Sequence, residues 1–280
     1  MNIKILTDST CDLSQTILDA NNITRVPLTV VKGDAQFKDG ITITPDEIFA
    51  HVAAGGALCS TSANSVGEYA DIFAQYADQF DGILHITIGS GFSSCYQNAC
   101  IAADDFNNVA VVDSMNLSTG QGLVVLEACR LAKECSSLEE LREKVQAFTS
   151  RVEASFLVDK LTYLVKGGRC SSAAALGANL LNLKPCIEVR DGKMQVVKKY
   201  RGNYAKCLAT YVKDRLDGRD DLRRDTLFVT KTPVTDECYS AVMEAVSQCP
   251  AFETVYETNA GCTVSCHCGP GTLGVLFVRK

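Results

Sequence analysis

Residues 83–94, Ile-Leu-His-Ile-Thr-Ile-Gly-Ser-Gly-Phe-Ser-Ser, decide the fold. The first six of them form a short, mostly apolar run, which is typical of a buried strand. The Gly89-Ser90-Gly91 sequence indicates a turn, and Ser93–Phe106 predicts the helix that follows it. A buried strand, a small polar turn and a helix together indicate one βα unit of a parallel sheet.

The same alternation continues through the rest of the first half. Thr44 before Pro45 predicts the start of a helix, because Thr is a good N-cap and Pro suits the first helical position. The strands expected in this half are Ile3–Leu6, Ile83–Ile88 and Val109–Val112, and the helices are Ile48–Ala53, Ser65–Phe80, Ser93–Phe106, Gly120–Lys133 and Ser137–Val152. Helices that separate strands in this way predict a parallel sheet.

The second half combines this pattern with a hairpin. Asp191-Gly192 between two strand-like runs is a strong signal for a tight β-turn, so we expect a mixed sheet. The strands expected are Ser155–Val158, Pro185–Val189, Met194–Tyr200, Thr226–Thr230, Glu253–Glu257 and Leu273–Arg279, and the helices are Ser171–Leu181, Tyr204–Leu216 and Asp236–Gln248. The prediction is an α/β protein of two domains: an N-terminal parallel-sheet α/β domain, 1–155, and a C-terminal α+β domain with a mixed sheet, 156–280, which contributes a loop that carries His267.

Composition narrows the class of protein. The 280 residues are 46% hydrophobic and 21% charged, which suits a well-packed globular protein. The net charge of −6 and the scattered Lys and Arg residues argue against a nucleic-acid partner. No signal-peptide pattern and no apolar run of roughly 18 residues is visible, so we expect a cytoplasmic protein. The fourteen cysteines lie mostly in apolar runs, which predicts reduced, buried thiols.

Three turns rich in Ser and Thr follow or precede predicted elements: 7–10, 60–65 and 89–94. Ligands of open parallel sheets bind outside the carboxyl ends of the strands, where such loops gather. Hydroxyl and N–H groups at helix N-termini suit an anion. Helix capping explains any one of these turns taken alone. The three together favour a small anionic group, a carboxylate or a phosphate.

The machinery of common enzymes is missing from the sequence. No Walker-type loop and no Gly-x-Ser-x-Gly elbow is present, so we expect no catalytic residues. Cys262–Cys268 has one residue between its last two cysteines and lacks a second Cys-x-x-Cys arm, so we expect no metal site. Of the three histidines, His267 lies just before the Gly269-Pro270-Gly271 turn, where it can meet a ligand or serve a structural role.

The ordered motifs of the whole chain resemble the DegV family of bacterial fatty-acid-binding proteins, the acyl-carrying subunits of fatty acid kinase systems. The motifs that carry the resemblance are Thr7-Asp8-Ser9, Thr61-Ser62, Phe92-Ser93-Ser94-Cys95-Tyr96, Asp113-Ser114, Gly120-Gln121-Gly122, Leu164-Val165-Lys166-Gly167-Gly168-Arg169, Leu183-Lys184-Pro185, Asp191-Gly192-Lys193, and His267 with Gly269-Pro270-Gly271.

The resemblance implies a lipid carrier without catalytic activity or cofactor. Its fatty acid is expected between or beneath the domains, with the carboxylate near five residues: Thr61, Ser62, Ser93, Ser94 and His267. The partners implied are a long-chain fatty acid and a separate ATP-dependent fatty acid kinase, and a transient contact with a membrane surface stays open. Gly168, Arg169 and Arg201 are implied as support for the site or the partner contact. A salt bridge at the domain interface is the alternative for the two arginines.

Two departures from the family pattern leave the ligand open. Ala63-Asn64 stands where the family commonly has a nearby Pro, and Ser94-Cys95 stands where it has Gly-Thr. The sequence therefore gives neither the preferred acyl chain nor the oligomeric state. Two other functions remain: an enzyme that acts on a small carboxylate with His267 as general base, and a regulatory binder of another amphipathic carboxylic acid.

Overall fold

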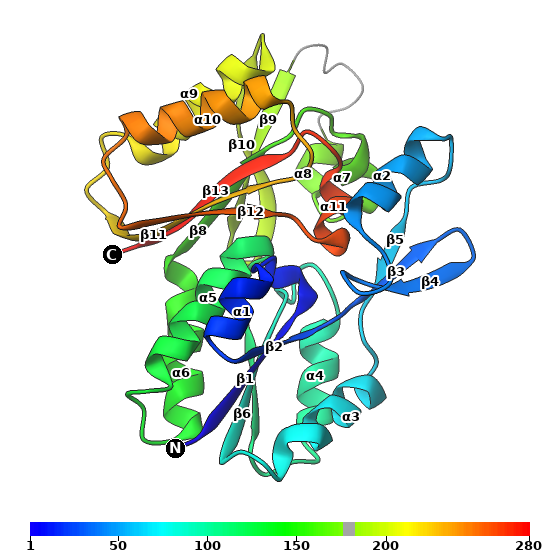
Figure 1. Cartoon of the computed structure of the whole chain (residues 1–280), viewed down its shortest axis with the longest axis vertical. Helices are drawn as coiled ribbons and strands as arrows, with labels where there is room; N and C mark the ends of the chain where they lie inside the picture. The colour runs from blue at the N-terminus through cyan, green and yellow to red at the C-terminus, as the bar shows by residue number, and fades with distance from the viewer. Residues whose placement is uncertain (176–182) are drawn as a thin grey trace.

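Four parallel strands form the sheet of the N-terminal half in the computed structural model, which describes residues 1–175 and 183–280. Their order is β2 (Ile23–Val26), β1 (Ile3–Asp8), β6 (Gly82–Thr87) and β7 (Val109–Asp113). The accompanying helices are α1 (Gln15–Ala20), α3 (Val66–Ala77), α4 (Cys95–Ala103), α5 (Ser118–Leu131) and α6 (Leu138–Phe148). Helices α5 and α6 cover one face and α3 and α4 the other, so β6 is buried along its whole length (Figure 1).

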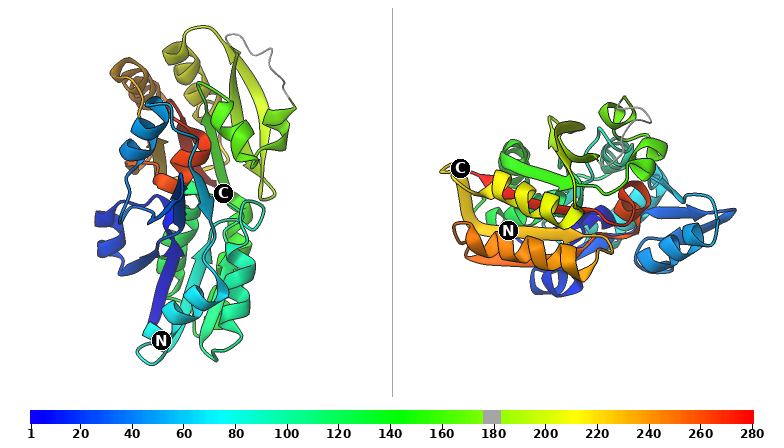
Figure 2. Two further views of the ribbon diagram at one scale, coloured as in Figure 1. Left: turned by 90° about the vertical axis from the view of Figure 1, so that its right-hand side faces the viewer. Right: turned by 90° about the horizontal axis from the view of Figure 1, so that it is seen from above.

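Six strands form the mixed sheet of the C-terminal half. In order they are β10 (Lys193–Arg201), β9 (Leu183–Arg190), β8 (Val152–Leu157), β13 (Leu273–Arg279), β11 (Leu222–Lys231) and β12 (Thr254–Asn259). The β9–β10 hairpin turns at Asp191 and Gly192, both with positive φ, as predicted. Helices α9 (Tyr204–Leu216) and α10 (Asp236–Gln248) pack on the outer face, and α5 packs on the inner face (Figure 2). These two sheets confirm the predicted fold class. We propose the domain division near residue 155, close to where α6 ends and β8 begins.

A small antiparallel sheet projects from the N-terminal half (Figure 1). It contains β4 (Ala35–Lys38), β3 (Thr29–Lys32) and β5 (Ser60–Ser62), with α2 (Pro45–Ala53) between β4 and β5. Thr44 is the N-cap of α2 as predicted, and together with Glu47 it forms a full capping box. The three strands were not predicted, because they are three or four residues long and carry no clear alternation. Strand β5 is the element that carries Thr61.

Three short helices surround the end of the inner sheet face: α7 (Thr162–Gly167), α8 (Ser171–Ala174) and α11 (Cys262–Cys268). The expected loop around His267 is wrong, because His267 lies in the last turn of α11, which ends at Gly269 with φ of 74°. Cys, Thr, Val and Ser fill α11, and none of these residues favours a helix strongly. The expected helix Ser171–Leu181 begins as predicted, and its residues 176–182 lie outside the described part of the chain.

One continuous apolar core joins the two large sheets. It includes Leu84 of β6, Val124 of α5 and Phe156 of β8. A second core lies between the outer face of the mixed sheet and α9 and α10. All fourteen cysteines are free thiols, thirteen of them buried and Cys100 half-buried. In the described part of the chain, no helix has the length and apolar character needed to cross a membrane.

Candidate functional site

Two adjoining cavities lie between the N-terminal half and the inner face of the mixed sheet. They share Leu117, Val264 and Cys268 in their walls. The first cavity also has polar side chains in its wall, namely those of Thr61, Ser62, Ser93, Arg169 and His267. The second is bounded mainly by small and apolar residues, among them Ala154, Phe156, Val189 and Leu276. The pair therefore has one polar end and one apolar end.

Thr61 and His267 form the central polar contact although they are 206 residues apart in sequence. Thr61 Oγ1 lies 2.8 Å from His267 Nε2. His267 Nδ1 is buried without a hydrogen-bond partner in the described structure. A buried N–H without an acceptor is costly, so we assign the ring proton to Nε2. His267 then donates to Thr61 Oγ1, and the Thr61 hydroxyl proton is free to point into the cavity. Thr61 and His267 both line the first cavity, so the structure brings these two predicted site residues together.

Ser93 is held so that its hydroxyl is also available. Its Oγ accepts a hydrogen bond from the Cys95 N–H at 3.3 Å and lies 3.1 Å from Cys95 Sγ. A thiol sulfur is a weak acceptor, so it competes poorly for the Ser93 proton. Tyr69, behind Cys95, donates to Asp8 at 2.9 Å. The Cys95 departure from the family pattern therefore leaves Ser93 as a donor toward the cavity.

Arg169 adds positive charge at the polar end. Its guanidinium donates to the Gly167 carbonyl at 2.8 Å and to the Phe92 carbonyl at 3.4 Å. The second contact joins the segment after α7 to the loop before α4. Burial, together with the smaller effect of the nearby Arg169 charge, lowers the pKa of His267 to about 4. The His267 ring is therefore neutral near pH 7, and Arg169 is the cation available to a carboxylate here.

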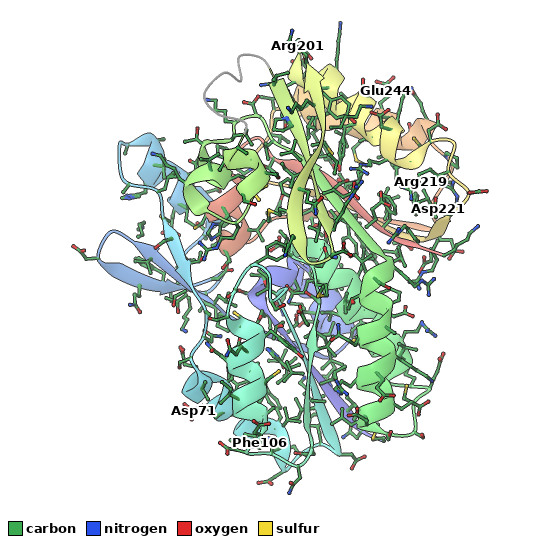
Figure 3. All side chains as sticks on the ribbon, turned by 180° about the vertical axis from the view of Figure 1, so that it is seen from behind. Asp71, Phe106, Arg201, Arg219, Asp221 and Glu244 are labelled. Carbon is green, nitrogen blue, oxygen red and sulfur yellow. The ribbon has the colours of Figure 1, made fainter. Side chains whose placement is uncertain are left out.

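Three residues of the predicted set lie outside both cavities. Ser94 is exposed and is the N-cap residue of α4, but its side chain makes no capping bond. Gly168 has φ of 69° and ends α7, which turns the chain before Arg169. Arg201 is exposed at the end of β10, at the outer end of the molecule (Figure 3). The Ser/Thr turn at 7–10 is also buried away from the two cavities.

Several wall residues were not found from the sequence. Thr263, Val264 and Cys268 precede or follow His267 on α11, and all three line the first cavity. Val264, His267 and Cys268 have the i, i+3, i+4 spacing of one helix face, which was the available signal. Met194 enters the same cavity directly after the β9–β10 turn. Its position depends on the packing of that hairpin against the other half, which local sequence does not reveal.

The walls of the apolar end come from alternate residues of the strands. Ala154 and Phe156 face inward from β8, whereas Ser155 bonds Tyr211 of α9 at 2.9 Å. Hydroxyls that border this cavity have internal partners, as Thr230 does with Thr119 and Thr258 at 2.5 and 2.8 Å. Because these polar atoms are satisfied within the protein, the cavity presents mostly carbon to a ligand.

A methyl group at Gly167 is expected to displace His267. A Cβ atom built on Gly167 comes within 2.5 Å of His267 Nδ1, so the ring must move. The Gly167→Ala protein should therefore lose the Thr61–His267 hydrogen bond, and the ¹⁵N signals of the imidazole should shift in the NMR spectrum. Gly67→Ala is the matched control, since no atom lies within 4 Å of a Cβ there. Unchanged His267 signals in Gly167→Ala would contradict this placement of the ring.

The low pKa of His267 predicts a pH dependence of stability. The pKa is about 4 in the folded chain and about 6.5 in an unfolded one. Between these values the unfolded chain binds a proton that the folded chain does not, so the free energy of unfolding decreases as pH falls from 6.5 to 4. Urea unfolding measured at several pH values in this range gives the free energy of unfolding as a function of pH. The contribution of His267 to this slope should be present in the natural protein and absent from His267→Gln. Identical slopes in the two proteins would contradict the prediction.

Metal ligands are not grouped in this region. Among residues 1–175 and 183–280, no three His, Cys, Asp or Glu side chains are placed to hold a metal ion together.

Comparisons with known proteins agree over the whole chain. The DegV family model, described as that of an uncharacterised protein, matches residues 2–280. A DegV domain-containing protein of Clostridium acetobutylicum is 34% identical over 281 residues, with 99% of each chain covered. A solved Thermus thermophilus DegV family protein, described by its fatty acid binding, is 29% identical with a TM-score of 0.89 over 100% of both chains. A stearic acid-binding protein from Eubacterium ventriosum is 28% identical with a TM-score of 0.79, with 99% of this chain and 98% of that chain covered.

Proposed function

The chain belongs to the DegV family, and from that premise we propose that it binds a long-chain fatty acid and presents the carboxylate to a separate ATP-dependent kinase. The observation that carries the proposal is the pair of adjoining cavities. One end offers hydroxyl donors and a guanidinium, and the other end offers apolar walls. A molecule with a carboxylate at one end of a hydrocarbon chain matches both ends at once.

The energetics divide between the two cavities. Each buried methylene contributes about 0.8 kcal/mol, so the acyl chain supplies most of the affinity. The carboxylate must be paired, since an unpaired charge in an apolar site is costly. Thr61 and Ser93 can each donate a hydroxyl proton to it, and Arg169 supplies the opposite charge. The polar end therefore orients the ligand and limits the cost of burying its charge.

Transfer to a kinase requires an accessible carboxylate and a surface for the partner. Between Asp159 and Arg201 the sequence carries nine Lys and Arg residues against three Asp and Glu residues, although acidic residues outnumber basic ones in the whole chain. Lys166 and Arg169 of this segment are exposed, and Arg169 lines the polar cavity. Basic charge around the cavity favours a partner that carries phosphate groups or acidic side chains. In this proposal the carrier itself transfers no phosphoryl group.

An enzyme is the second candidate, because Thr61 and His267 resemble a nucleophile beside a general base. Their 2.8 Å contact has the right length. Such a base normally has its second nitrogen held by an acceptor, and His267 Nδ1 has no such partner in the described structure. Turnover of an acyl ester or thioester by the protein alone, lost in His267→Gln, would support the enzyme.

Native mass spectrometry tests the proposed function. The protein expressed in bacteria should carry a mass increment equal to that of a fatty acid, and lipid removal followed by addition of palmitate should restore an increment. A protein that stays free of lipid after palmitate is added would overturn the proposal. A defined mixture of saturated and unsaturated acids would then show which chain is preferred. Competition with other amphipathic acids separates fatty acid binding from the regulatory alternative.

A further inference from the structure

Two buried carboxylates from the N-terminal half meet the start of α11. Asp39 Oδ1 accepts the Cys262 N–H at 2.9 Å, and Asp39 Oδ2 accepts the Thr263 N–H at 3.2 Å. Asp12 Oδ1 accepts the Gly261 N–H at 2.8 Å. Three successive backbone N–H groups that have no partner within the helix are thereby satisfied from the other half of the molecule.

Side-chain hydroxyls complete the contact. The Thr263 and Ser9 hydroxyls donate to Asp39 Oδ2 at 2.7 and 2.9 Å. The Ser118 hydroxyl donates to Asp12 Oδ2 at 2.5 Å. Asp39 is only 2% exposed and Asp12 6% exposed. Each carboxylate is therefore held on both oxygens and has little freedom to move.

The backbone around Asp12 is strained, whereas the dipole of α11 stabilises the two carboxylates at its N-terminus. Asp12 and Ser118 have φ of 50° and 52°, which is unfavourable for residues other than Gly. Neither Asp12 nor Asp39 forms an ion pair with a Lys or Arg in the part of the chain that the structure describes. The positive end of the α11 dipole is their counterpart instead. Asp39 accepts two of the three backbone N–H groups and Asp12 accepts one, so Asp39 is the better candidate for the anchor.

We propose that Asp39 is a positioning residue for the fatty acid site, which acts by anchoring α11 so that His267 meets Thr61. Helix α11 is seven residues long, so Asp39 holds its first turn and His267 lies about 6–7.5 Å further along the helix axis. Thr61 belongs to the same projecting sheet as the segment that carries Asp39. Both ends of α11 therefore contact the same part of the N-terminal half: the first turn bonds Asp39, and His267 in the last turn bonds Thr61. The inference rests on the proposed function and adds to it the residue that aligns the polar end of the two cavities.

Asp39→Asn tests the anchor with little change in side-chain shape. An amide nitrogen cannot accept a hydrogen bond, so at least one donor from α11 loses its acceptor. We expect palmitate affinity to fall by about 10-fold, by analogy with the roughly 10- to 100-fold losses that follow removal of a residue that orients a metal-binding His. The pKa of His267, measured by ¹⁵N NMR, should rise toward its ordinary value as the helix end loosens. With only three histidines in the chain, single substitutions assign the signals.

Asp34→Asn is the matched control, because Asp34 is exposed in the same projecting sheet and should bind palmitate as the natural protein does. If Asp39→Asn does not fold, Thr263→Val removes one donor to Asp39 and leaves the backbone contacts, so its smaller shift of the His267 signals decides the question. Natural affinity together with natural His267 signals in the Asp39 or Thr263 variant would overturn the inference. Failure of the natural protein to bind palmitate would instead count against the proposed function, while the NMR signals would still report on the anchor.

Discussion

Thr61→Val is expected to weaken palmitate binding by about 10- to 100-fold. Val keeps the shape of Thr but removes the hydroxyl that receives the His267 proton and can donate its own to the carboxylate. A hydrogen bond to a charged group contributes roughly 1.5–3 kcal/mol, and every 1.4 kcal/mol is a factor of ten in affinity. The substitution also leaves the buried His267 N–H without its acceptor, which adds to the loss. Lipid-free protein is titrated with palmitate in a calorimeter, or with a fluorescently labelled fatty acid. The chain has no tryptophan, so the label gives the fluorescence signal.

Thr29→Val is the matched control for this experiment. Thr29 lies in β3, pairs with Ser62 of β5, and does not line either cavity. It should bind palmitate like the natural protein. Natural affinity in Thr61→Val as well as in Thr29→Val would remove Thr61 from the carboxylate site, while a similar loss in both variants would point to a general effect on the projecting sheet.

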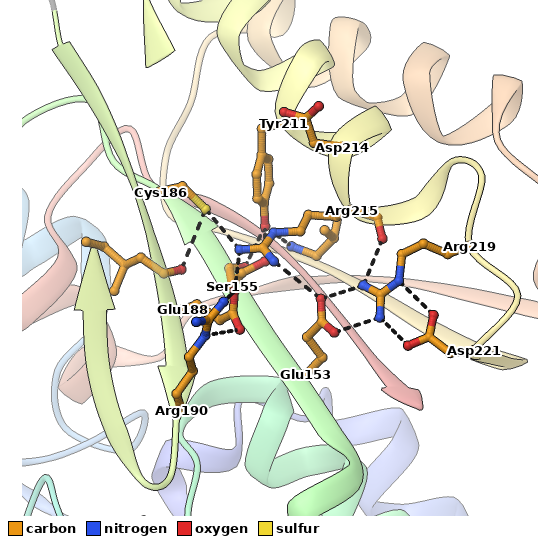
Figure 4. A network of polar contacts seen from close by, with 12 residues as sticks. Glu153, Ser155, Cys186, Glu188, Arg190, Tyr211, Asp214, Arg215, Arg219 and Asp221 are labelled. Atoms are coloured by element: carbon orange, nitrogen blue, oxygen red, sulfur yellow. Dashed lines mark hydrogen bonds and ion pairs between the residues drawn. The ribbon is translucent and has the colours of Figure 1, made fainter. Parts of the chain in front are cut away.

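Glu153→Gln is expected to lower the free energy of unfolding by about 1.5–3 kcal/mol. Glu153 lies on β8 between Arg215 and Arg219, whose guanidinium nitrogens are 3.5 and 2.8 Å from its Oε1 (Figure 4). Glu153 is 10% exposed and Arg215 15% exposed, so water screens this network weakly. Arg215 keeps Glu188 at 2.7 Å and Arg219 keeps Asp221 at 2.6 Å, so neither arginine is left unpaired, and the cost is that of the lost hydrogen bonds between charged groups, about 1.5–3 kcal/mol. The midpoint of urea unfolding should fall accordingly.

The exposed pair of Glu139 and Arg142 on α6 provides the comparison. Glu139→Gln should change stability by about 0–1 kcal/mol, as is usual for surface ion pairs. Glu153 faces α9, on the opposite side of the sheet from Ala154 and Phe156, so folded Glu153→Gln should retain palmitate binding. An unchanged unfolding midpoint would mean that the network contributes little to holding α9 against the sheet.

Strongly periodic elements of this fold could be predicted from the sequence. Tyr204–Leu216 and Asp236–Gln248 match α9 and α10 to the residue, since each has a capping residue and a clear apolar face. The strand at 83–88 and the Asp-Gly hairpin were found for similarly local reasons. Strands β3 to β5 and helix α11 were not found, because short elements depend on tertiary packing more than on propensity.

The polar loops of the site could be predicted from the sequence, but the contacts between their side chains could not. The Ser/Thr turns at 60–65 and 89–94 do reach one cavity, whereas the turn at 7–10 contributes to the anchor of α11. No local pattern shows that His267 faces Thr61 or that Gly167 must be small beside the ring. Such relations arise where the two halves meet. Arg169 and Arg201 were treated alike in sequence, and only Arg169 lines the cavity.

The burial of the thiols makes alkylation of cysteine a measure of folding in this chain. Thirteen of the fourteen cysteines are buried, and burial raises the pKa of many of them, Cys11 and Cys268 to about 12. A thiol reacts with alkylating agents as the thiolate, so these side chains are protected twice, by access and by protonation. A brief pulse of alkylating agent will modify few sites in the folded chain and all fourteen in an unfolded one. The number of alkyl groups per molecule, measured by mass spectrometry, therefore reports the unfolded fraction from the natural cysteines alone.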